Sequence, residues 1–130
     1  MEEKLFKIME LENGLVLRLY DASKKVAGDR WQVSFLAKIE ISIDYFLSDK
    51  TFSPNITMTQ IKEVLGNIII FEQKRERNFI DEKEKDEVFK ALCVSFLSSS
   101  LSYLSDYDFP KKLIMKKYKE NIGRQKWHDT

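Results

Sequence analysis

Residues 31–47, WQVSFLAKIEISIDYFL, carry the most regular pattern in the chain. The odd-numbered positions from Trp31 to Leu47 are apolar, whereas most even-numbered positions are polar. Successive side chains of a strand point to opposite faces, so this alternation predicts a long strand with one buried face and one wet face. A strand of this length would extend about 55 Å, which exceeds the width of a small domain, so we expect a bend near its middle.

The segment that precedes this strand predicts a β-hairpin. Apolar residues alternate with polar ones on both sides of the tripeptide Glu-Asn-Gly at 12–14, which is rich in turn-forming residues. A three-residue loop with Gly14 in the left-handed conformation pairs Leu11 with Leu15 and gathers the leucines on one face. We favour it over a two-residue loop, which would set Glu10 against that face.

The middle of the chain is less regular. Residues 21–30 break the alternation and are expected to form a turn or a short helical turn. Residues 48–56 are expected to form a loop. Thr57 or Thr59 then caps a short helix that closes at the next glycine, and residues 67–80 return to strand.

The last third of the chain predicts two helices. Acidic residues at 81–84 stand where a helix dipole favours them, and an apolar stripe at three- and four-residue spacing follows from Val88 to Leu104. Pro110 is suited to the first turn of a second helix, for which Gly123 is the expected end.

Together these elements predict a single α+β domain over residues 1–130. It contains a mainly antiparallel four-stranded sheet made of the N-terminal hairpin, the long strand 31–47 and the strand 67–80. Two C-terminal helices pack on one face of this sheet, because one apolar sheet face and two apolar helix stripes must be hidden from water. The alternative is a strongly curved sheet wrapped around the long helix.

Composition narrows the class of protein. The 130 residues are 43% apolar and 33% charged, with a formal net charge of +1, so no overall field attracts nucleic acid or membrane. The acidic N-terminus predicts no signal peptide, and the most apolar short run, residues 68–71, is far too short to span a membrane. A single cysteine suits a reducing compartment, so we expect a cytoplasmic protein that makes no membrane contact.

Few residues are suited to catalysis. Cys93 lies on the apolar stripe of the long helix and is expected to be a small buried side chain, and His128 stands close to the C-terminus. Asp21 and Asp29 flank one loop, where turn capping and a local ion pair with Arg30 are the expected roles. The sequence therefore predicts no catalytic residue, no metal site and no cofactor.

Six residues are candidates for contact with another molecule. Arg30 and Trp31 are of the types that anchor interfaces, although Trp31 is also in phase with the buried positions of its strand. Leu36 and Phe46 are out of phase with that core and would form a second apolar patch. Arg75 and Arg77 share one strand face and could bind a phosphate or carboxylate, although a charged, solvated edge is the simpler interpretation.

Charge is unevenly distributed along the chain. Residues 111–130 hold seven basic and two acidic residues, and the rest of the chain is net acidic. A basic helix of this kind, with Tyr118 and Trp127 as aromatic residues, could bind nucleic acid, although it could also be an ordinary solvated face. The basic residues of this patch are Lys111, Lys112, Lys116, Lys117, Lys119, Arg124 and Lys126.

These observations favour a non-catalytic cytoplasmic interaction module. We expect it to act through protein–protein contacts, as a homo-oligomer or with a protein partner. Nucleic-acid binding through the basic C-terminal helix is the first alternative. Small-ligand binding between the sheet and the helices is the second.

Overall fold

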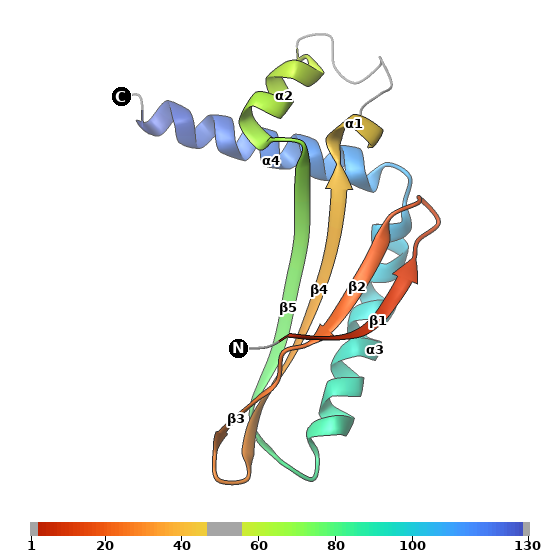
Figure 1. Cartoon of the computed structure of the whole chain (residues 1–130), viewed down its shortest axis with the longest axis vertical. Helices are drawn as coiled ribbons and strands as arrows, with labels where there is room; N and C mark the ends of the chain where they lie inside the picture. Colours follow the sequence, from red (N-terminus) through yellow and green to blue (C-terminus); the bar gives the residue numbers. More distant parts are fainter. Residues whose placement is uncertain (1–2, 47–55, 129–130) are drawn as a thin grey trace. The chain divides into compact units, whose positions relative to one another are not determined.

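The structure, a computed structural model, describes residues 3–46 and 56–128, with the backbone alone at 46 and 124–128 (Figure 1). The loop expected over residues 48–56 falls almost entirely outside this part of the chain. The elements in chain order are β1 (Lys4–Glu10), β2 (Val16–Asp21), β3 (Lys24–Ala27), β4 (Arg30–Ser42), α1 (Ile43–Phe46), α2 (Met58–Leu65), β5 (Ile68–Asp81), α3 (Lys85–Ser105) and α4 (Phe109–His128).

The chain divides into two compact units. One is built from residues 1–39 and 71–106, and the other from residues 40–70 and 107–130. The first unit contains most of the sheet together with α3. The second contains α1, α2 and α4. A single domain over residues 1–130 stays a prediction.

The sheet is antiparallel, as the sequence predicts, and the α+β class is confirmed. Its strand order is β1-β2-β4-β3, and β5 also pairs with β4. In the first hairpin the backbone N–H of Leu11 donates to the carbonyl of Leu15 at 2.8 Å, and Met9 stands opposite Leu17. Gly14 has a φ of 88°, so the three-residue loop with its left-handed glycine is confirmed.

The sheet has one strand more than expected. After a short break at Ala22 and Ser23, the chain of β2 continues as β3, which pairs with the start of β4 through a turn at Gly28 and Asp29. Gly28 has a φ of 55°, a conformation that glycine adopts at little cost. A Gly-Asp pair between two runs is a recognised hairpin signal, but Lys24–Ala27 is too short and too polar to show alternation.

β4 keeps the predicted alternation but is shorter than expected. Its odd positions from Val33 to Ile41 are fully buried, and the strand gives way to α1 at Ile43. The expectation that Leu36 is exposed is wrong, since only 3% of this residue is accessible. β4 has strands on both sides, and Leu36 stands directly opposite Tyr20 of β2, so cross-strand neighbours bury its side chain.

α3 lies along the sheet of the first unit (Figure 1), and aromatic contacts join the two. The ring of Phe35 on β4 lies 5.2 Å from that of Phe96 and 6.2 Å from that of Phe89, both on α3. Phe6 reaches Phe89 edge-on at 5.1 Å. The register of β1 shifts between Leu5 and Lys7, and this bulge makes Phe6 the extra residue of the strand.

The side chain of Asn13 ties the first hairpin to the end of α3. Its amide nitrogen donates to the carbonyls of Leu104 and Asp106, both at 2.8 Å, and its amide oxygen accepts from the N–H of Leu15 at 3.1 Å. Only 8% of Asn13 is accessible. The last carbonyls of a helix have no partners within the helix, so this amide satisfies groups that the fold would otherwise bury unpaired.

The second unit contains three helices in mutual contact, α1, α2 and α4. α2 begins with a capping box, in which Thr57 accepts from the N–H of Gln60 and the Gln60 side chain accepts from the N–H of Thr57. This confirms Thr57, rather than Thr59, as the cap. Buried in this unit are Ile61, Phe109, Ile114 and Tyr118.

α4 begins at Phe109 with Pro110 in its first turn, as expected, but it does not end at Gly123. It continues as a helix to His128. A glycine inside a helix costs about 1 kcal/mol relative to alanine, which is too little by itself to end a helix.

We expect Asn13→Ala to destabilise the first unit by about 1–3 kcal/mol, because two carbonyls at the end of α3 lose their donor. Asn13→Asp keeps the acceptor for Leu15 but removes the same donors and adds negative charge at the negative end of a helix dipole. It should therefore be at least as destabilising at neutral pH. Urea unfolding measures both, and an Asn13→Ala variant as stable as the parent would contradict this role.

Phe79 is strained and exposed, with a φ of 58° and 76% of its surface accessible. A bulky residue in the left-handed region costs about 1–2 kcal/mol, whereas glycine adopts this region freely. We expect Phe79→Gly to be more stable than Phe79→Ala by about 1 kcal/mol, since only glycine relieves the strain. Thermal melts of the two variants test this, and the opposite order would remove the strain argument.

Candidate functional site

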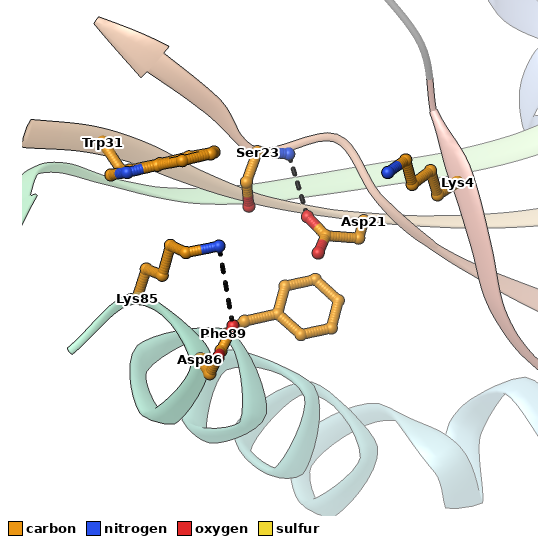
Figure 2. Close-up of a pocket in the computed structure, with 7 residues that line it drawn as sticks. All are labelled: Lys4, Asp21, Ser23, Trp31, Lys85, Asp86 and Phe89. Atoms are coloured by element: carbon orange, nitrogen blue, oxygen red, sulfur yellow. Dashed lines mark hydrogen bonds and ion pairs between the residues drawn. The ribbon is translucent and has the colours of Figure 1, made fainter. Parts of the chain in front are cut away.

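A small cavity lies between the sheet of the first unit and the start of α3 (Figure 2). Its volume is about 140 Å³. Two lysines, two aspartates, a serine and two aromatic rings line it, namely Lys4, Lys85, Asp21, Asp86, Ser23, Trp31 and Phe89. This is the place that best corresponds to the predicted pocket between sheet and helices.

Some polar groups of this cavity already have partners within the protein, whereas the buried indole N–H of Trp31 has no hydrogen-bond partner among the described residues. The ammonium of Lys85 lies 4.2 Å above the indole ring of Trp31, where it makes a cation–π contact. The carboxylate of Asp21 accepts from the N–H of Ser23 at 2.9 Å, which is the turn-capping role expected of it. Ligand pockets usually measure about 300–1,000 Å³, so the size of this cavity gives no support to small-ligand binding.

The structure does not bring the predicted arginines together into an anion site. Arg30 is exposed and pairs with Asp81 at 3.2 Å and with Asp29 at 4.0 Å. Arg75 is half-buried against α3, where it donates to the hydroxyls of two serines at 3.3 Å and lies over the ring of Phe96. Arg77 is exposed. Each guanidinium therefore has a different environment.

Leu36 takes no part in the apolar patch that the sequence predicts for Leu36 and Phe46. Leu36 is buried, and the side chain of Phe46 lies outside the described residues. Two other apolar side chains on β1, Leu5 and Ile8, are about half exposed. Leu5 was missed because the alternation of β1 marks its odd positions as buried, whereas the bulge at Phe6 reverses the direction of the residues before it. Ile8 occupies an even position after the bulge, on the opposite face from Met9.

Cys93 is buried on the sheet side of α3, as expected from the apolar stripe. The pKa of its thiol is raised to about 11, mainly by burial and also by the carboxylate of Asp21, while the ammonium of Lys7 lowers it in part. The thiolate is the reactive form of cysteine. At neutral pH this side chain therefore behaves as a small apolar group.

The side of α3 that faces away from Phe96 is unusual for an exposed helix. Residues 91–105 contain no charged residue, although a third of the whole chain is charged. We call the outer face of α3 the stripe opposite the core, which consists of Ala91, Val94, Ser98, Leu101 and Ser105. The first three are exposed and the last two half-buried, and 63% of Val94 is accessible.

α3 is also the one helix of the described chain that is long and apolar enough to cross a membrane. Its 18-residue window has a mean hydropathy of 1.3. Core helices of soluble proteins pass the same test of length and composition. The property therefore shows how apolar α3 is, and it does not identify a membrane protein.

A strongly basic face runs along α4 in the second unit. A shallow groove of about 560 Å³ is lined there by Lys111, Lys112, Met115, Lys116 and Lys119, with Asp108 at its start. We call these residues the basic face of α4. Lys117 is half-buried outside this groove, and the side chains of Arg124 and Lys126 lie outside the described residues. The structure thus brings together four of the seven predicted basic residues.

Tyr118 cannot serve as a stacking platform for bases. It is 6% accessible and belongs to the buried side of α4. Its burial contradicts the contact with bases that the sequence suggested for it, and fits its four-residue spacing from Ile114 and Ile122.

No family model, curated protein or solved structure matches this chain. Within residues 3–46 and 56–128, no group of three histidine, cysteine, aspartate or glutamate side chains could hold a metal ion.

We expect the stability of the protein to fall as pH rises from about 9 to 11, in part because of Cys93. The folded state raises the pKa of this thiol from 9.0 to about 11, so the unfolded chain releases the proton first. Below pH 9 the thiol leaves the free energy of unfolding nearly unchanged. At pH 11 the loss of stability due to this group amounts to about 2–3 kcal/mol.

The matched control for this effect is Cys93→Ala. It should be less stable than the parent at pH 7, because it leaves a small cavity, but the difference should narrow by pH 11 as the parent loses stability. Urea unfolding at each pH measures both. A constant difference between the two proteins from pH 7 to 11 would contradict the raised pKa.

Proposed function

We propose that this protein is a non-catalytic interaction module that associates with a second copy of itself through the outer face of α3. The observation that carries the proposal is the charge-free stretch at residues 91–105, which the fold leaves partly exposed. The buried, protonated thiol of Cys93 supports a non-catalytic role. The single cysteine supports a cytoplasmic location.

The absence of charge lowers the cost of burying this face. A helix on the surface of a soluble protein normally carries charged residues on its wet side. At the composition of the whole chain, about five of the fifteen positions from 91 to 105 would be charged. Burying a charged group without a partner is expensive, and no such group has to be dehydrated here.

The spacing of the outer face suits a second helix. From Ala91 to Ser105 its five residues are separated alternately by three and four positions, which is the seam of a coiled coil. Val94 and Leu101 supply apolar area, whereas the serines and the alanine are small and allow two helices to approach closely. A continuous stripe of about 20 Å is available for contact.

The chemistry of the seam favours an identical partner. A serine hydroxyl both donates and accepts, so Ser98 and Ser105 can be satisfied by the same groups on a second copy. Such a surface is self-complementary and fits the two-fold contact of a homodimer. Glu87 lies four residues before Ala91 on the same stripe, so an antiparallel pair of helices keeps the two glutamates apart.

We expect the purified protein to show twice its 15.4 kDa mass in light scattering at micromolar concentrations. Ser98→Glu places a charge in the middle of the seam and should give a monomer with unchanged circular dichroism. Thr59→Glu, at an exposed position in the first turn of α2, makes a change of the same charge away from the seam and should leave the dimer intact.

Three results would contradict the proposal. They are a parent that stays monomeric at high concentration, a Ser98→Glu variant that remains dimeric, and a parent that floats with lipid vesicles as a monomer. The last result would mean that lipid, rather than a second copy, covers α3.

A further inference from the structure

The basic face of α4 conflicts with two rules of helix stability. Lys112 stands in the first turn, at the end of the helix dipole that disfavours cations, and the nearest acidic residue, Asp108, lies just before the helix. Lys112, Lys116 and Lys119 are spaced by four and three residues, so like charges are neighbours on one face. Each arrangement weakens an isolated helix.

The lysines of this face also differ from those elsewhere in the protein. Lys38 pairs with Glu3 at 3.0 Å, and Lys62 pairs with Asp44 at 2.8 Å. In the described part of the chain, by contrast, no carboxylate forms a salt bridge with Lys112, Lys116 or Lys119. Features that cost stability without a compensating contact are expected at functional sites.

We propose that the basic face of α4 binds the phosphate backbone of nucleic acid without reading its sequence. The three lysines extend over about 10 Å of helix, and double-stranded DNA carries one negative charge per 1.7 Å or so of its axis. Phosphates therefore outnumber the ammonium groups along this length, and every lysine can find an anion. The site uses no residue of the outer face of α3.

The neighbouring residues explain why the binding is independent of sequence. The groove holds no arginine, asparagine or glutamine side chain, which are the usual groups for reading base edges. Tyr118, the aromatic residue at this level of the helix, is buried. Contacts to phosphate position a protein on nucleic acid but carry no direct sequence information.

The same geometry favours nucleic acid over a membrane surface. A helix that lies in the interface of a membrane inserts a broad apolar face beneath its basic residues. In α4, Phe109, Ile114 and Tyr118 are buried in the protein, and Leu113 and Ile122 are half-buried. Met115 is the one apolar residue that lines the groove.

Fluorescence anisotropy of a labelled 25-base-pair duplex of mixed sequence, titrated with the full chain, tests the proposal. We expect binding at 50 mM salt and a slope of log K against log salt of about −3, since the three lysines neutralise three phosphates. Lys116→Gln should reduce the magnitude of that slope by about 1, equally for duplexes of different sequence.

Two triple variants distinguish binding by the basic face of α4 from a general effect of net charge. Replacing Lys112, Lys116 and Lys119 together by Gln should abolish binding at 50 mM salt, and its melting temperature should equal or exceed that of the parent because repulsion is relieved. Replacing the exposed Lys25, Lys83 and Lys90 by Gln changes the net charge equally in the first unit and should leave the slope unchanged.

Several outcomes would overturn the proposal. These are the absence of binding by the parent at 50 mM salt, an unchanged slope in the α4 triple variant, and an equal loss in the control triple variant. Tighter binding to phosphatidylserine vesicles than to the duplex, lost in the α4 variant, would assign the face to membranes instead. A Ser98→Glu variant that still binds the duplex shows that this site is independent of association through α3.

Discussion

The amide side chain of Asn13 is the interaction on which the first unit depends. It stands in the turn of the first hairpin and donates to two carbonyls at the end of α3, so one residue closes both a turn and a helix. The aromatic contacts of Phe35 with Phe89 and Phe96 set the distance between α3 and the sheet. Burial supplies the attraction between the two layers, and the amide sets the position at which the helix stops along the sheet.

The two long helices at the end of the chain divide the charges unequally. α3 has no charged residue after Lys90, whereas α4 presents four lysines around a single groove. Both patterns depart from the alternation of core and wet faces that stabilises an ordinary surface helix. The exposed side of α3 is uncharged, whereas that of α4 is cationic, so the two surfaces suit partners of different chemistry.

Local patterns predicted the hairpin loop, the buried positions of β4, the cap at Thr57 and the two long helices, because each depends on residues close together in sequence. Longer-range features were less accessible. The burial of Leu36 depends on strands on both sides of β4, and the partners of Asn13 are more than ninety residues away. The strand β3 has only four residues and no apolar alternation, so its pairing with β4 defines it.

The sequence indicates which residues the candidate surfaces contain, but not which side of each helix these residues occupy. The lysines of α4 could be counted from the sequence, whereas the separation of Lys117 from the groove requires the phase of the helix against its buried side. The outer face of α3 was overlooked since a serine-rich, uncharged helix gives a weak signal while its other side is assigned to the core. The solvent exposure of the side chains, rather than their residue type, distinguishes the outer face of α3 from its core side.

The irregularity at Phe6 has a consequence for how copies of the protein can meet. β1 is an edge strand of the sheet, and its extra residue kinks the backbone there. The same edge strand carries the charged residues Lys4, Lys7 and Glu10. A kinked and charged border is a poor template for a further strand from another molecule. Growth by strand addition, which leads toward fibrils, is thereby discouraged at this border.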